Sequence, residues 1–311
     1  MRRTDATGRD GAWAGLELEV TGRPRPGLCP YVADGRRLVL RRADGAPVLF
    51  GRVTRDDCGV DFLRAGAFRS PLPPLRADTA RRVRGPARWA HRFADALERA
   101  ADSPLHDGRW ALTAGTRFQR WRPENESPVA YWRDLLVEGD PDGELDWFVH
   151  NGYWEVLPLR AWPDATDARV KAYRKQAADG TLPPVLLWWF SGFDAHLVLD
   201  GHARLVAALA EGVEPPVLEL LRLAPADEVT KDTATAVATY GAEMARFRTL
   251  RAAHGERVPD GAALMGPVLA RALHDARSGH RPTWAWPLPG GAEQWDRTAR
   301  ELAPGWEGLR G

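Results

Sequence analysis

Apolar residues in the N-terminal third recur with the two-residue period of β-strands. Residues 16–20 alternate as a half-buried strand does, and residues 37–42 and 47–53 flank a short polar turn, which indicates a β-hairpin. Residues 86–101 instead predict a helix with Pro86 in its first turn and an apolar stripe of Trp89, Phe93 and Leu97. These patterns predict an N-terminal α+β domain over residues 1–122.

The middle of the chain has a denser pattern of short apolar runs. A strand is expected at 155–159, and Asp164 or Thr166 is expected to cap the helix that follows, which Gly180 ends. The remaining elements are expected at 185–190 (strand), 195–199 (strand), 200–211 (helix) and 217–221 (strand). The order strand–helix–strand–strand–helix–strand describes one small layered domain, to which we assign residues 123–225.

The C-terminal part is predicted to be helical. Residues 229–253 and 262–277 have helical patterns, and the tail at 284–306 combines Trp, Pro and Gly with one short helix. We assign residues 226–311 to this region. The fold class expected for the whole chain is therefore α+β, a small mixed α/β module flanked by an N-terminal α+β domain and a C-terminal helical region.

The amino-acid composition excludes several classes of protein. The chain has 311 residues, 44% of them hydrophobic and 27% charged, which is typical of a globular protein. Its longest uncharged run, 181–193, is too short to span a bilayer, and no apolar signal core follows the N-terminus, so we expect a cytoplasmic protein without a membrane partner. Cys29 and Cys58 are expected to be reduced thiols. The histidines show no ligand pair at helical spacing, so no metal site is assigned.

Charge is distributed unevenly along the chain. Residues 1–100 contain 20 Arg and 12 Asp plus Glu, a balance of +8, and the total of +1 leaves −7 for the remainder. A basic half can mark a nucleic-acid partner. Because Arg outnumbers Lys throughout the chain, a compositional bias of the source genome is the alternative explanation for this excess of arginine.

The sequence Asp200-Gly201-His202-Ala203-Arg204 lies between an apolar strand and an amphipathic helix. Such a junction directs unpaired backbone N–H groups and the positive end of the helix dipole at one point, where phosphate binds well. Gly201 would let a ligand approach the backbone, and the Arg204 fork suits phosphate. His202 would add a hydrogen-bond donor. The alternatives are that Asp200 is only the N-cap, that Gly201 is only a tight turn, that His202 is a surface histidine and that Arg204 is a solvated charge.

The run from Leu197 to Ala208 resembles the signature of the ParB/sulfiredoxin-like superfamily, in which many members read Asp-Gly-His-His-Arg. Residues 155–159, 169–180 and 182–185 resemble the preceding elements of that domain, so that the match covers about 70 of 311 residues. The resemblance implies a nucleotide- or phosphate-handling domain. ATP and CTP are then the candidate ligands, with Mg²⁺ as a candidate companion ion.

The departures from the family pattern limit what is implied. Sulfiredoxins carry a catalytic Cys where this chain has His202, which argues against sulfinic-acid reduction. Chromosome-partition ParB proteins read Gly-Glu-Arg-Arg at the turn, and no helix pair for DNA binding is evident. The nearest branch contains ParB-like nucleases and small-molecule kinases, but Ala203 replaces the second His, which puts catalysis in doubt.

Three functions remain open at the level of sequence. The first is an ATP-dependent phosphotransferase in which Gly201, His202 and Arg204 hold phosphates, Asp200 assists Mg²⁺, and Glu155 or Asp164, chosen by position, acts as the base. The second is a nucleotide-binding module without turnover, acting in regulation or interaction. The third is a nucleic-acid processing protein that uses the basic N-terminal half.

Overall fold

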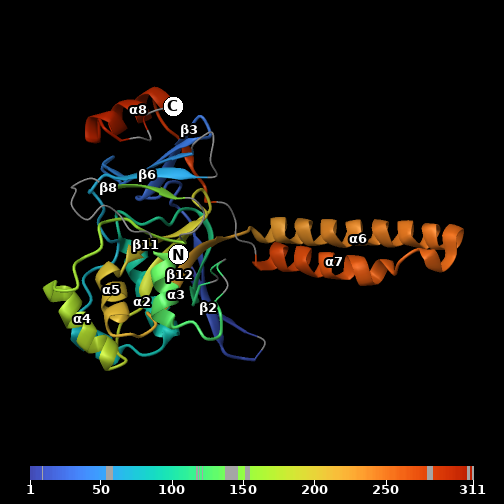
Figure 1. Ribbon diagram of the computed structural model, residues 1–311, viewed down its shortest axis with the longest axis horizontal. Coiled ribbons are helices and arrows are strands. Elements are labelled where there is room, and N and C mark those ends of the chain that lie inside the picture. Colours follow the sequence, from blue (N-terminus) through green and yellow to red (C-terminus); the bar gives the residue numbers. More distant parts are fainter. Residues whose placement is uncertain are drawn as a thin grey trace. The chain divides into compact units, whose positions relative to one another are not determined.

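The computed structural model describes residues 1–8, 10–53, 59–116, 118, 120, 122–136, 146–150, 155–278, 283–306 and 309. The chain forms two compact units (Figure 1). The larger comprises Met1–Leu221 with Pro282–Gly311, and the smaller comprises Arg222–Arg281. The smaller unit begins close to the predicted boundary between 225 and 226, and the division into 1–122, 123–225 and 226–311 stays a prediction.

A seven-stranded sheet forms the centre of the larger unit. Its order is β1 (Arg2–Thr7), β2 (Trp13–Val20), β7 (Gly108–Ala114), β12 (Val217–Leu223), β10 (Val185–Phe190), β11 (Ala195–Asp200) and β9 (Val156–Pro158). β10 is parallel to β12 and antiparallel to β11, which is in turn parallel to β9. The sheet is therefore mixed, and it joins strands from both sides of the predicted boundary near residue 122. The expectation of a mixed α+β chain is confirmed at this coarse level.

A second sheet contains the predicted hairpin. Its order is β13 (Trp286–Pro287), β3 (Cys29–Ala33), β4 (Arg37–Arg41), β5 (Pro47–Val53), β6 (Val60–Arg64) and β8 (Asp146–His150). β4 and β5 pair antiparallel, as the sequence predicts. Cys29 is a buried free thiol, and burial raises its pKa to about 11. Cys58 lies outside the described residues.

The two faces of the seven-stranded sheet have different partners. One face packs on α2 (Pro86–Arg99) and on the second sheet, with Trp188, Phe93 and Phe62 in the shared core. The predicted helix at 86–101 is thus confirmed. The opposite face packs on α3 (Pro128–Leu135) and α5 (His202–Ala210). α4 (Ala168–Ala178) in turn packs on α5 through Val170. Because side chains alternate along each strand, each face has its own apolar set.

The C-terminal tail belongs to the core of the second sheet. α8 (Gly291–Leu302) buries Trp295 completely against Phe50 and Trp306, and the Trp295 indole N–H donates to the Leu38 carbonyl at 2.8 Å. Chain segments about 250 residues apart in sequence therefore share one apolar cluster. The sequence predicted the helix but not its partner.

The smaller unit is a helical hairpin. α6 (Ala226–His254) leads through a short 3-10 turn, η1 (Gly255–Arg257), into α7 (Gly261–Ser278), and the two helices lie side by side (Figure 1). Gly261 permits this approach, because a Cβ there would lie 2.5 Å from the Phe247 ring. Among the described residues, no helix is long and apolar enough to cross a membrane.

We expect Trp295→Ala to destabilise the larger unit by about 3–5 kcal/mol, because it removes a fully buried side chain and leaves a cavity. Trp284→Ala is the matched control, since Trp284 is 56% exposed, and it should cost less than half as much. Urea denaturation followed by tryptophan fluorescence measures both variants. Equal costs would show that the tail does not belong to the core.

Candidate functional site

The turn between β11 and α5 occupies the end of the central strands. Gly201 is the N-cap of α5 and has φ of 107°, a backbone conformation that favours glycine. A Cβ at this position would lie 2.8 Å from the Arg204 Nη2 atom and 3.1 Å from the Cα of Val185. Gly201 therefore makes room for the folded-back Arg204 side chain as well as for the turn itself. The prediction of Asp200 as the N-cap is wrong, because the cap residue is Gly201 and no side chain caps the helix.

Asp200 and Arg204 form a buried ion pair one helical turn apart. Arg204 Nη2 donates to the Asp200 carboxylate and also to the Pro184 carbonyl at 2.9 Å. The Ser70 hydroxyl donates to the other carboxylate oxygen of Asp200 at 2.6 Å. The side chain of Arg204 is 3% exposed. A basic residue in the first turn of a helix needs an anion or an acid nearby, and Asp200 supplies this countercharge.

His202 is the first residue of α5 and is buried at 1% exposure. Its ring lies 5.5 Å from that of Trp162 and 6.0 Å from that of Phe68, measured between centroids. Its Nε2 atom has no hydrogen-bond partner among the described residues. Burial, and then the charges of nearby arginines, lower the pKa of His202 well below its usual 6.5, so the ring is neutral at physiological pH. The neutral ring can donate or accept one hydrogen bond at Nε2.

Three further arginines surround the turn, and none of them was predicted from the sequence. Arg64, at the end of β6, is 3% exposed and donates from Nη1 to the Arg160 carbonyl at 3.2 Å. Partial burial, together with the charges of Arg169 and Arg204, lowers the pKa of Arg160, whereas Asp200 raises it. The side chains of Arg160 and Arg169 form no ion pair with any described residue. The local charge is therefore positive.

The first turn of α5 adds three backbone donors. Gly201 accepts the first intrahelical hydrogen bond, from Leu205 N–H at 2.8 Å. No described residue accepts a hydrogen bond from the backbone N–H of His202, Ala203 or Arg204, although all three residues are buried. Unpaired N–H groups at a helix N-terminus carry the positive end of the helix dipole. Donors and positive charge thus converge at one place.

The structure separates the three acids that the sequence proposed as catalytic. Asp200 lies at the turn. Glu155 precedes Val156, which pairs with His196 at the opposite end of β11, so Glu155 lies about 13 Å or more along the strand from Asp200. There its carboxylate accepts a hydrogen bond from the backbone N–H of Arg120 at 2.5 Å.

Asp164 lies in the loop that enters α4, and it is exposed. Its carboxylate accepts a hydrogen bond from the Thr166 N–H at 2.6 Å, and this backbone hydrogen bond is the main cause of its lowered pKa. The N-cap of α4 is Asp167, not Asp164 or Thr166 as the sequence predicted, and its carboxylate accepts from Arg169 N–H at 2.7 Å. Asp164 therefore stabilises the loop before the helix.

Strand register explains the position of Arg160, and the sequence predicted both strands but not their pairing. The parallel pairing of β9 with β11 sets Pro158 opposite Val198, which brings Arg160 level with Asp200. Locating Arg64 from sequence would have required the packing of the second sheet. No group of three or more His, Cys, Asp or Glu among the described residues could hold a metal ion.

Comparison of the chain with protein-family models, with curated proteins and with solved structures finds no match.

Arg204→Ala should destabilise the protein by about 3 kcal/mol, because it leaves the Asp200 carboxylate without its buried countercharge. Arg169→Ala is the matched control and should change the unfolding free energy by less than about 0.5 kcal/mol. Urea denaturation of both variants, without ligand, measures the difference. If the two variants were equally stable, the ion pair would have no structural role.

The free energy of unfolding should fall as pH drops below about 6.5. The reason is that His202 binds a proton in the unfolded state, whereas the buried ring of the folded state stays neutral. While the folded ring stays neutral, this contribution reaches about 1.4 kcal/mol per pH unit. The His202→Gln variant lacks it. The difference in unfolding free energy between wild type and variant, measured from pH 7.5 to 5, should therefore change little above about pH 7 and approach that slope well below pH 6.5. A constant difference would contradict the buried neutral state.

Proposed function

We propose that the N-terminus of α5 binds a phosphate group of a nucleotide or another phosphorylated ligand. The observation that carries this proposal is the set of unpaired donors at the turn, namely the Nε2 atom of buried His202 and the backbone N–H groups of residues 202–204. A phosphate accepts several hydrogen bonds at once, and the helix dipole favours its negative charge. The resemblance to the ParB/sulfiredoxin-like superfamily supports the same ligand class.

Arginine side chains supply the charge for such a ligand. Arg160 and Arg169 have no ion-pair partner among the described residues, so their guanidinium groups are available to an anion. Arg204 contributes differently, because its pairing with Asp200 fixes the start of the helix. We therefore assign phosphate contact to Arg160, Arg169 and His202, and positioning to Gly201, Asp200 and Arg204.

Binding without turnover is the function that the geometry favours over phosphoryl transfer. A phosphotransferase needs a base within hydrogen-bond reach of the acceptor. Glu155 lies at the far end of β11, and Asp200 is engaged by both Arg204 and Ser70. Exposed Asp164 is the acid left for such a role, and it also caps its own loop. We propose a nucleotide-binding regulatory or interaction module, with ATP or CTP and Mg²⁺ as first candidates.

The proposal predicts ligand stabilisation in thermal melts. A ligand at one hundred times its Kd stabilises the folded state by about 2.7 kcal/mol, which raises the Tm by several degrees. Pyrophosphate, ATP, CTP and GTP, each with and without Mg²⁺, are the probes. We expect a rise with at least one of them in the wild type and little or no rise in the Arg160→Ala/Arg169→Ala double variant.

The matched control is the Arg248→Ala/Arg251→Ala double variant, which removes two exposed arginines from α6 and changes the net charge equally. It should retain the full ligand-induced rise in Tm. No rise with any probe at millimolar concentration would refute the phosphate site. If both double variants lost the ligand-induced rise in Tm equally, the rise would depend on net charge alone and not on Arg160 and Arg169.

A further inference from the structure

A second concentration of arginine lies outside the candidate phosphate site, on α2 and the segment before it. Residues 69–99 include α1 (Ala77–Arg82) and α2, and they contain eight arginines, Arg69, Arg76, Arg81, Arg82, Arg84, Arg88, Arg92 and Arg99. All eight are exposed. The same stretch holds three acids, Asp78, Asp95 and Glu98. We call this arginine-rich stretch of the chain the arginine face.

The acids of this stretch are already paired. Asp78 accepts from Arg82 at 2.7 Å. Arg3, on the neighbouring β1 strand, donates to both Asp95 and Glu98. The other seven arginines of the face form no ion pair with any residue that the structure describes. The face therefore carries a strong excess of positive charge that the residues described in the structure do not neutralise.

The arginines on α2 form one stripe. Arg88, Arg92 and Arg99 follow the spacing of four and seven residues that keeps side chains on one side of a helix, and the apolar side of α2, with Trp89 and Phe93, is buried. From Arg88 to Arg99 the stripe spans about 16 Å at 1.5 Å per residue. Asp95 lies on the same side of the helix, between Arg92 and Arg99, and is neutralised by Arg3. The stripe is thus a row of three arginines on one helix, with one paired carboxylate between them.

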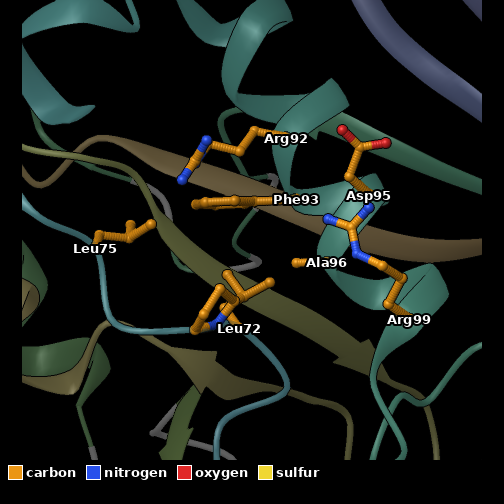
Figure 2. A pocket seen from close by; sticks show the side chains of 8 residues that line it. Leu72, Leu75, Arg92, Phe93, Asp95, Ala96 and Arg99 are labelled. Atoms are coloured by element: carbon orange, nitrogen blue, oxygen red, sulfur yellow. The ribbon is translucent and has the colours of Figure 1, made fainter.

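Two hollows show that the preceding segment lies along the same helix. One, of about 80 Å³, lies between Leu72 and Leu75 on one side and Arg92, Phe93 and Arg99 on the other. In Figure 2, Arg92 and Arg99 extend from α2 at the two ends of this hollow, with Phe93 and Ala96 between them.

The second hollow, of about 190 Å³, lies at the start of α2, where Arg84 and Trp89 line it together with Pro184. The segment that contains α1 therefore adjoins α2 at both of the helix's ends. Arg84 therefore lies beside the first turn of α2, near the start of the helix that carries the stripe.

We propose that the arginine face binds the phosphodiester backbone of a nucleic acid. An extended row of unpaired guanidinium groups on a helix matches a polyanion whose charges repeat along a line, and binding would release condensed counterions. Backbone binding of this kind does not read sequence, because phosphate contacts position a protein without specifying bases. This surface is separate from the α5 turn and takes a different ligand.

Fluorescence anisotropy with the full chain tests the proposal. The probes are a labelled 20-nucleotide DNA strand, the corresponding RNA strand and the 20-bp DNA duplex, each titrated between 50 and 200 mM salt. We expect micromolar binding of at least one probe at 50 mM salt and a steep loss of affinity as salt rises. Arg88→Ala/Arg92→Ala should weaken that binding at least tenfold. It should also make the slope of log K against log salt concentration shallower, by the amount expected for the loss of about two phosphate contacts.

The Arg248→Ala/Arg251→Ala variant of α6 makes the same change in net charge at another exposed surface and should bind as the wild type does. The Arg160→Ala/Arg169→Ala variant should also keep nucleic-acid binding, which separates this face from the phosphate site. Absence of binding to all three probes at 50 mM salt would overturn the proposal. A loss in the α6 variant equal to that in the α2 variant would overturn it as well.

Discussion

The ion pair between Asp200 and Arg204 is the contact on which the candidate site depends. It holds the first turn of α5 against the end of β11, and it exists because Gly201 leaves room for the guanidinium group. Only the Nη2 atom of Arg204 is used in this pair. Arg204 Nε, His202 Nε2 and the first backbone N–H groups of α5 have no hydrogen-bond partner among the described residues. A positive charge at a helix N-terminus is unfavourable alone, and Asp200 offsets that cost. The pair thus stabilises the turn and leaves its donors available for an anion.

Much of the local structure could be predicted from the sequence. The apolar runs of β10, β11 and β12 and the amphipathic stripe of α2 are properties of short windows, so their positions followed from periodicity. The strand-to-helix junction at Gly201 was also predicted, because glycine and the change of period mark it in the sequence.

The long-range contacts could not be predicted in the same way. Asp is a residue type that often caps helices, so the sequence alone suggests that role for Asp200. In the structure its carboxylate instead accepts a hydrogen bond from Ser70, which is 130 residues away in sequence. Arg64 reaches the site from the second sheet, and Trp295 of the tail packs on that sheet. The burial of Arg204 and its pairing with Asp200 could not be predicted for the same reason, since a local pattern shows its charge but not its burial.

The two proposed anion-binding surfaces lie on the same unit and differ in physical character. The α5 turn offers a few buried donors fixed by strand register, which suits a single phosphate group. The arginine face offers exposed, unpaired charges on a helix, which suits a polymer and should respond strongly to salt. With a nucleotide at the α5 turn and a nucleic acid on the arginine face, the larger unit would recognise phosphate groups at two separate sites.

The central claim concerns the Nε2 atom of His202, and NMR of the ¹⁵N-labelled histidine ring observes that atom directly. The account predicts that pyrophosphate or the best-binding nucleotide shifts the His202 Nε2 resonance and raises the pKa of the ring, since an anion offsets the surrounding arginine charges. Arg248→Ala/Arg251→Ala should leave this response intact. An unchanged His202 resonance and pKa at saturating ligand would contradict the claim that the turn binds phosphate.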